Sequence, residues 1–216
     1  MQIIGVVARK GGAGKTTTAI HLAGELTARG RSVELVDCDL QGSASHWAEL
    51  GALPFPVHRM PIEREADVPS WSARVRALQA DLVILDAPPH LDAASGAVIG
   101  MADVVLIPCG PTGLDLVATA ETVGLVREIR ERRGGRAPRI LLVPNRVDRR
   151  TASGQELQAA LRDLKEVVAP PVGYRTAFAD SFNAGQWVGV YAPRSFAHME
   201  ASALADVVLK ALKVKP

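Results

Sequence analysis

The feature that most constrains this sequence is a glycine-rich loop between an apolar run and a helical pattern. The apolar run covers residues 2–8, and the helical pattern begins near residue 16. The loop and the first helical residues are Lys10, Gly11, Gly12, Ala13, Gly14, Lys15, Thr16 and Thr17. Glycines let backbone N–H groups converge on phosphate oxygens, and a helix presents its positive N-terminal end to the same anion. Because Lys15 can reach β- and γ-phosphates and Thr16 can hold Mg²⁺, the pattern predicts a nucleotide phosphate site.

Apolar runs and helical patterns alternate along all 216 residues. We expect strands at 2–8, 32–36, 57–60, 82–85, 104–107, 140–143 and 172–175, and helices at 16–29, 41–50, 71–80, 114–133, 153–168, 179–186 and 196–212. The strands are continuous apolar runs, which is typical of a parallel sheet covered by helices on both faces. No repeat or linker divides the chain. The sequence therefore predicts one α/β domain over residues 1–216, a P-loop NTPase with a mostly parallel, twisted sheet.

Polar side chains stand where several expected strands end. Asp37 and Asp39 follow the second strand, Asp86 ends the fourth, and Asn145 follows the sixth. Ligands of open α/β sheets bind at the carboxyl ends of the strands. We therefore expect these four side chains to lie near the phosphate loop.

Composition excludes several classes of protein. No apolar run approaches the roughly 20 residues needed to span a bilayer, and no signal peptide is visible at the N-terminus. Cys38 and Cys109 lack a CxxC spacing, which favours two reduced, buried thiols in a cytoplasmic protein. Aromatic residues make up only 4% of the chain, so we do not expect stacking on bases or sugars to dominate recognition.

The charge is unevenly distributed along the chain. Residues 1–120 hold 9 Lys and Arg against 13 Asp and Glu, whereas residues 121–216 hold 16 against 10. The two segments therefore carry net charges of −4 and +6. This asymmetry fits an anionic partner on one face, and it fits a solvated arginine-rich surface equally well.

The loop departs from the general G-x-x-x-x-G-K-[ST] pattern, because Arg9 replaces the first glycine and a second lysine, Lys10, follows. This deviant form resembles the loop of the ParA/MinD family of ATPases. Residues 37–41 (DCDLQ) resemble the DxDxQ motif of that family, although the family more often has proline where Leu40 stands. Residues 82–89 resemble its Walker B strand, and residues 111–115 and 145–146 match further family positions.

The resemblance implies a role for each matching residue. Lys10 would be the signature lysine, which reaches across a homodimer to the ATP bound by the partner subunit. Lys15 and Asp39 would complete the catalytic set, with Asp39 positioning the attacking water; a helix N-cap is the alternative for Asp39. Asp86 would join Thr16 in holding Mg²⁺, in its case through water. Asn145 would hydrogen-bond the adenine, with a turn-forming role as the alternative.

Residues 46–47 and 174–177, and a chain that starts directly at the first strand, resemble the short ParA proteins of plasmid partition. Such proteins dimerise with ATP and coat nonspecific DNA until a centromere-binding or adaptor protein stimulates hydrolysis, so we expect a cytoplasmic protein that associates with the nucleoid when ATP is bound. The cargo, plasmid or chromosomal, is not encoded in these motifs. The candidate DNA contacts are Arg149, Arg150, Arg175, Arg194, Lys210, Lys213 and Lys215.

Three alternatives stay open at this point. A MinD-like ATPase would cycle on a membrane through an amphipathic C-terminal helix, for which the tail has mixed apolar and basic residues but no aromatic anchor. A scaffold-type ATPase would use the same nucleotide chemistry to position a protein complex. An iron–sulfur carrier would need cluster ligands, and neither cysteine lies in such a motif.

Overall fold

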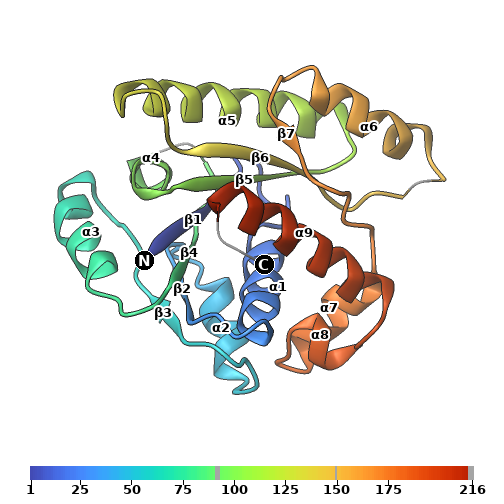
Figure 1. Ribbon diagram of the computed structural model, residues 1–216, viewed down its shortest axis with the longest axis horizontal. Coiled ribbons are helices and arrows are strands. Elements are labelled where there is room, and N and C mark those ends of the chain that lie inside the picture. The colour runs from blue at the N-terminus through green and yellow to red at the C-terminus, as the bar shows by residue number, and fades with distance from the viewer. Residues whose placement is uncertain (91–92, 149, 214–216) are drawn as a thin grey trace.

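The computed structural model describes residues 1–90, 93–148 and 150–213. In these residues one seven-stranded sheet runs through the molecule in the order β3-β2-β4-β1-β5-β6-β7 (Figure 1). The strands are β1 (Gln2–Val6), β2 (Val33–Asp37), β3 (Val57–Arg59), β4 (Leu82–Asp86), β5 (Val104–Cys109), β6 (Arg139–Pro144) and β7 (Val167–Val168). Every neighbouring pair is parallel. The α/β fold with a parallel sheet is therefore confirmed.

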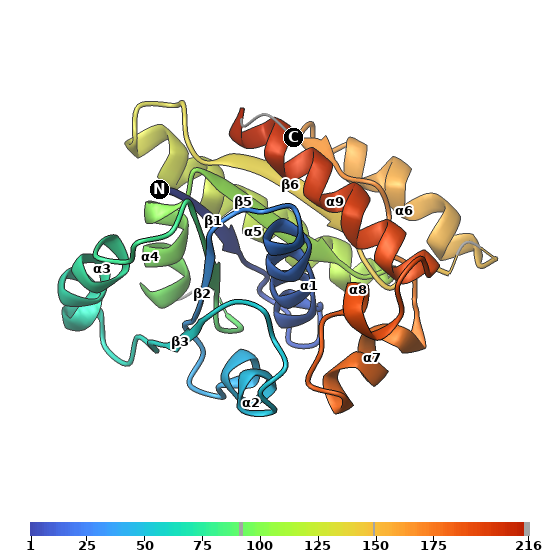
Figure 2. The same cartoon turned by 60° about the horizontal axis from the view of Figure 1, so that its bottom comes forward.

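Helices cover both faces of this sheet (Figures 1 and 2). One group contributes to the core on the first face: α1 (Lys15–Ala28), α2 (Ser43–Glu49), α8 (Val188–Tyr191) and α9 (Phe196–Leu212), with α7 (Thr176–Asn183) packed beside it. The second face carries α3 (Val68–Arg76), α4 (Ala93–Met101), α5 (Gly113–Arg132) and α6 (Ala152–Arg162). A short 3₁₀ turn, η1 (Glu65–Asp67), precedes α3.

The strands bury both of their faces. Successive side chains of a strand point to opposite sides of the sheet. Ile4 of β1 and Leu106 of β5 join the core beneath α1 and α9, whereas Ile3 and Val105 join the core beneath α4 and α5. This two-sided burial is why the strands are continuous apolar runs in the sequence.

The register of the central strands assembles the site. Asp37 of β2 lies opposite Asp86 of β4, and Asp86 lies opposite Val6 of β1. The chain leaves β1 at this edge and enters the glycine-rich loop. The loop therefore begins beside two carboxylates that are distant from it in sequence.

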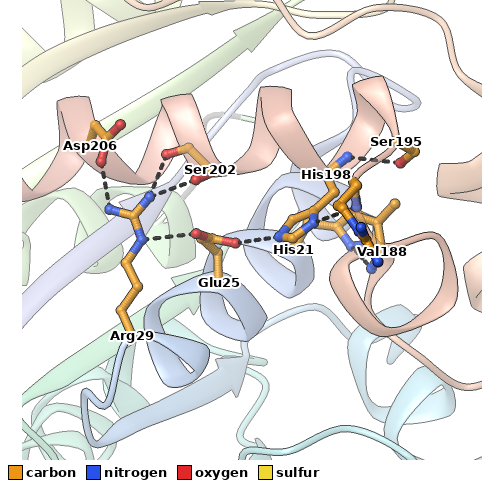
Figure 3. Close-up of polar contacts among 9 residues, drawn as sticks. His21, Glu25, Arg29, Val188, Ser195, His198, Ser202 and Asp206 are labelled. Carbon is orange, nitrogen blue, oxygen red and sulfur yellow. Dashed lines mark hydrogen bonds and ion pairs between the residues drawn. The ribbon is translucent and has the colours of Figure 1, made fainter.

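A polar network fixes α9 on α1, the helix that follows the loop (Figure 3). Glu25 is only 5% exposed, yet both of its carboxylate oxygens have partners: Arg29 Nε at 2.8 Å and His198 Nε2 at 3.1 Å. Arg29 also donates to Asp206 Oδ1 at 2.6 Å and to the Ser202 carbonyl at 2.9 Å. A buried carboxylate is costly unless it is paired, so these contacts define one register between the two helices.

Several element boundaries differ from those expected. The helix expected over 153–168 ends at Arg162, and Val167 and Val168 form the edge strand β7 instead. The strand expected at 172–175 is reduced to a single bridge between Val147 and Gly173. The helix expected at 179–186 begins at Thr176 and ends at Asn183, and neither α4 nor α8 was expected.

Candidate functional site

The glycine-rich loop has a backbone that only glycine adopts easily. Gly12 and Gly14 have φ values of +73° and +94°. A Cβ atom on Gly14 would lie 2.2 Å from Asn145 Nδ2, so the close approach of Asn145 excludes any side chain there. Gly14 is also the N-cap of α1, and no side chain caps this helix. The first-turn amides of α1 are therefore available to an anion bound in the loop.

Lys15 is the first residue of α1 and its side chain is directed into a buried, acidic environment. The residue is 8% exposed. Burial lowers the pKa of Lys15 from its ordinary value, while Asp86 and Asp39 act in the opposite direction. An ammonium group without a close ion-pair partner in a buried site is well prepared to bind a phosphate anion.

Thr16 and Asp86 form the second part of the site. Thr16 Oγ1 donates to Asp86 Oδ2 at 2.6 Å, whereas Asp86 Oδ1 is buried and has no hydrogen-bond partner among the described residues. Burial raises the pKa of Asp86 to about 7, although the Thr16 hydrogen bond lowers it. A hydroxyl beside a carboxylate with an unused oxygen is a donor set that suits Mg²⁺, which prefers oxygen ligands and keeps several waters.

This oxygen pair does not form a complete metal cage. Across the described ranges, no cluster of three or more His, Cys, Asp or Glu side chains is arranged to hold a metal ion. Mg²⁺ commonly binds through one or two protein oxygens together with substrate phosphates and water. Thr16 and Asp86 therefore fit a magnesium ion that arrives with a nucleotide.

The two aspartates after β2 have different surroundings. Asp37 is fully buried, and its carboxylate accepts from the Ser45 amide and hydroxyl, both at 2.8 Å. Asp37 thus holds the first turn of α2. Asp39 accepts from the Gln41 amide at 3.0 Å and lines the cavity beside the loop. The N-cap of α2 is Gly42, so the alternative reading of Asp39 as a helix N-cap is wrong.

Asn145 braces the loop from the end of β6. Its Nδ2 donates to the Ala13 carbonyl at 2.7 Å, and its Oδ1 accepts from the Arg146 amide at 3.0 Å. Arg146 has a φ of +57° and donates from Nη1 to the Gly12 carbonyl at 3.2 Å. The structure therefore brings Asn145 against the loop, as the sequence predicted, and adds Arg146 to the same contact.

A cavity of 690 Å³ opens over the loop. It is lined by loop residues, Asp39 and Asn145, and also by four aromatic side chains: Trp47, Tyr174, Phe178 and Phe182. The low aromatic content of the chain did not suggest this concentration at one site. Residues 46–47 and 174–177, where a resemblance to partition ATPases had been noted, contain two of the four. Phe178 and Phe182 carried no signal, because they lie one turn apart on a helix whose start was misplaced.

Lys10 lies away from this cavity. Its Nζ is 2.6 Å from Asp115 Oδ1, on the first turn of α5. It lines a small separate hollow between the loop and α5. The structure thus brings Gly11, Gly12, Gly14, Lys15, Thr16 and Thr17 to the cavity, whereas Lys10 and Ala13 line the hollow at its flank.

The candidate DNA contacts do not gather on one surface. Arg150 pairs with Asp148 at 2.8 Å and Arg175 with Glu200 at 2.7 Å, and Arg175 lies at the cavity edge. Lys210 and Lys213 lie at the end of α9, where Gln2 at the start of β1 donates to the Leu212 carbonyl. Both lysines therefore lie at the end of the sheet where β1 begins, opposite to the end that carries the cavity. Arg194 precedes α9, and Arg149 and Lys215 lie outside the described residues.

Both cysteines are free and buried, as expected. Burial raises the pKa of the Cys109 thiol to about 11 and holds that of Cys38 well above its ordinary value. Both thiols are therefore protonated at neutral pH. Thiolate chemistry at either position is not favoured by these surroundings.

Comparison with known proteins identifies relatives of this chain. The sequence profile of the CobQ/CobB/MinD/ParA nucleotide binding domain matches residues 4–188. The maintenance of carboxysome distribution protein A of Gloeobacter kilaueensis is 40% identical over 172 residues, which cover 76% of this chain and 71% of the relative. The chromosome-partitioning ATPase Soj of Thermus thermophilus is 33% identical over 226 aligned residues, 89% of each chain.

Solved structures have the same fold. The septum site-determining protein MinD of Pyrococcus horikoshii, complexed with Mg-ADP, superposes with a TM-score of 0.75 at 22% sequence identity. The match covers 100% of this chain and 99% of that one. The two proteins therefore share one fold over their whole lengths.

Proposed function

The chain belongs to the CobQ/CobB/MinD/ParA family and is an ATPase of the ParA/MinD type, and we propose that ATP and Mg²⁺ switch it from a monomer to a DNA-binding dimer that positions cargo. The observation that carries the proposal is that Lys15, Thr16 and Asp39 line one cavity, with the buried Asp86 hydrogen-bonded to Thr16 behind it. Each has the chemistry that a bound Mg–nucleotide requires.

The residues divide the chemistry among themselves. Loop amides and Lys15 neutralise the phosphate charge, while Thr16 and Asp86 hold the metal ion, Asp86 through water. Mg²⁺ would supply positive charge that offsets the negative charge of the phosphates. Asp39 orients the attacking water from the end of β2, where its carboxylate faces the cavity. Asn145 holds the loop in shape and contacts the adenine.

Dimer formation depends on Lys10. The family resemblance assigns this lysine to the nucleotide of the partner subunit, and its position outside its own cavity supports that assignment. A cation supplied in trans stabilises phosphate charge only when two subunits face each other. ATP binding and dimerisation are thereby coupled, and hydrolysis, stimulated by an adaptor protein, ends the association.

The dimer binds DNA through its phosphates and without base-specific contacts. The excess of positive charge in residues 121–216 supports this proposal, because phosphate contacts need only Lys and Arg on a surface. The protein would then be cytoplasmic and would associate with the nucleoid while ATP is bound. The candidate basic residues lie in separate places, with Arg175 at the cavity edge and Lys210 near the end of α9. Charge reversal at each of these two positions, followed by measurement of DNA binding, shows which of them contacts DNA.

The direct experiment is binding of wild-type protein to a random-sequence duplex in ATP–Mg²⁺ and in ADP–Mg²⁺ over a range of salt concentrations. We expect binding only with ATP–Mg²⁺, with an affinity that falls steeply as salt rises. Binding that ignores the nucleotide, or that is unaffected by salt, would contradict the proposal.

A second candidate cargo is a protein microcompartment. The 40% identity to a maintenance of carboxysome distribution protein favours it, because positioning of protein bodies would use the same nucleotide switch. Deleting the gene in its host and scoring plasmid loss against microcompartment spacing separates the two cargoes.

The membrane-cycling alternative needs an amphipathic C-terminal helix that inserts in a bilayer surface, and not a membrane-spanning helix. Within the described part of the chain, no helix is both long and apolar enough to cross a bilayer. The apolar face of α9, including Leu204, Val208 and Leu212, is buried in the core against α1 and the sheet. Insertion of this helix in a membrane would therefore require it to leave the fold. Co-sedimentation with anionic liposomes in ATP–Mg²⁺ tests this alternative.

A further inference from the structure

The first two residues of the loop are both tied to α5 of their own subunit. Arg9 pairs with Glu121, and Lys10 Nζ lies 2.6 Å from Asp115 Oδ1. Lys10 occupies the hollow between the loop and α5, where Ala13 and Thr119 are its neighbours. In this conformation its ammonium group is held on the side of the loop that faces away from the cavity.

Asp115 is well placed to hold a lysine, because its own position is fixed. It is the N3 residue of a capping box at the start of α5, in which its Oδ2 accepts from the Thr112 amide at 3.1 Å and the Thr112 hydroxyl at 2.6 Å. A Cβ atom at position 110 would lie 2.6 Å from Oδ2, so Gly110 makes the room for this carboxylate.

The two oxygens of Asp115 therefore have separate partners. Oδ2 caps the helix and Oδ1 binds Lys10, so Lys10 can leave without uncapping α5. The side chain of Asp115 is 10% exposed and that of Lys10 is 42% exposed. Burial alone would raise the pKa of Asp115, and the hydrogen bonds from Lys10 and Thr112 hold it below its ordinary value.

We propose that Asp115 is a positioning residue for Lys10: it holds the lysine on its own subunit in the monomer, and dimerisation transfers the lysine from this carboxylate to the phosphates of the partner's nucleotide. The proposal rests on the ATP-dependent dimer proposed above. Each dimer that forms must break two such pairs, one per subunit. Removing the carboxylate charge should therefore make dimerisation easier.

The test is the dimer dissociation constant of Asp115→Asn in saturating ATP–Mg²⁺, measured by analytical ultracentrifugation. The amide oxygen of asparagine can still accept from Thr112, so the cap survives while the charge is lost. An exposed ion pair is worth up to about fivefold in an equilibrium constant, and because the effects of the two broken pairs multiply, we expect the dimer to tighten by up to about 25-fold. Asp115→Glu keeps the negative charge, and glutamate at the N3 position also forms a capping box. This variant should therefore have the dimer dissociation constant of the wild type.

Glu121→Gln is the matched control. It releases Arg9 from the same helix, and Arg9 has no proposed contact with a nucleotide, so the dimer constant should stay at the wild-type value. An Asp115→Asn dimer that is unchanged or weaker than wild type would overturn the proposal. If the wild-type protein itself forms no dimer with ATP–Mg²⁺, the proposed function fails, and the inference with it.

A measurement on the nucleotide-free monomer tests the ion pair separately. In Lys10→Met, the carbon-13 resonance of the Asp115 carboxyl should titrate at a higher pH than in wild type, because burial persists when the cation is gone. This readout reports the pair itself and is insensitive to general loss of stability. Identical titrations in the two proteins would show that the pair does not form in solution, and the proposal would fall.

Discussion

Asp86 shows at the level of one residue how strongly this site is prepared for a ligand. Its Oδ1 is buried without a hydrogen-bond partner in the ranges that the structure describes, a situation that is rare and costly in a folded protein. Burial raises its pKa to about 7, so a bound cation would restore the charged form that burial disfavours. The site is therefore incomplete without a metal-bound ligand, and part of the binding free energy offsets this cost.

Gly14 offers the sharpest stability test of the loop. Gly14→Ala should lower the free energy of unfolding by about 2 kcal/mol or more, because the new Cβ meets Asn145 Nδ2 and φ is +94°. Gly11→Ala is the control within the same loop: no atom lies within 4 Å of its added Cβ, and a change within about 0.5 kcal/mol is expected. Urea denaturation of the nucleotide-free proteins measures both. Equal losses at the two positions would show that the loop is not braced by Asn145.

His21 predicts a pH dependence of stability. It lies on α1 and accepts from the Val188 amide at 3.1 Å (Figure 3). Its buried ring packs against Trp47 and Phe178. Burial lowers its pKa from 6.5 to about 3. Between these two values the unfolded chain binds a proton that the folded protein does not, so stability falls as pH falls, by about 1.4 kcal/mol per unit.

Replacing His21 tests this linkage. His21→Gln removes the titration, so the stability advantage of wild type over the variant should shrink by about 2 kcal/mol between pH 7 and pH 5. Thermal or urea unfolding at a series of pH values provides the comparison. Parallel stability curves for the two proteins would mean that His21 is protonated equally in both states.

Among the elements, the contact between α1 and α9 depends on one buried carboxylate. Glu25→Ala leaves Arg29 and His198 without their acceptor, and we expect a loss of about 3 kcal/mol in the free energy of unfolding. Asp206→Ala removes a partner of Arg29 that is 63% exposed, and it should cost less than about 1 kcal/mol. Chemical denaturation distinguishes these values. Equal effects would indicate that the buried pairs do not determine how α9 packs.

The central elements could be predicted from sequence because burial on both faces leaves a strong apolar signal. The elements after β6 could not be predicted as well. Leu164, Val167 and Val168 continue the apolar spacing of α6, but Lys165 adopts a φ of +56° and ends the helical turn, after which the two valines pair with β6. The turn at Arg146 similarly limits residues 172–175 to one bridge. Both outcomes depend on tertiary contacts that a local pattern does not contain.

The residues of the site likewise fall into those that the sequence predicts and those that it does not. The loop, Thr16 and Asp86 were predictable, because strand ends of a parallel sheet meet at one edge. The aromatic lining was not, since Trp47 and Phe182 come from helices 135 positions apart in the sequence and meet only in the fold, with ring centroids 5.1 Å apart. The pairing of Lys10 with Asp115 was equally hidden, because 105 positions separate the two residues in the sequence.

At the scale of the whole molecule, charge is arranged differently from its distribution along the chain. Residues 121–216 are basic, yet several of their arginines are committed to carboxylates: Arg127 and Arg130 to Glu166, and Arg175 to Glu200. The sequence asymmetry therefore overstates the cationic surface available to DNA. A nucleotide-dependent dimer could supply the remainder, since two copies of each uncommitted cation would then act on one duplex.

The proposed switch is tested most directly by sedimentation of Asp39→Ala in ADP–Mg²⁺ and in ATP–Mg²⁺, each with and without nonspecific duplex DNA. The substitution removes the carboxylate that we propose orients the attacking water and leaves Lys15, Thr16 and Asp86 in place, so ATP should bind and persist. We predict a monomer with ADP, and with ATP a stable dimer that co-sediments with DNA. A protein that remains monomeric with ATP, or a dimer that ignores DNA, would contradict the proposed partition-type mechanism.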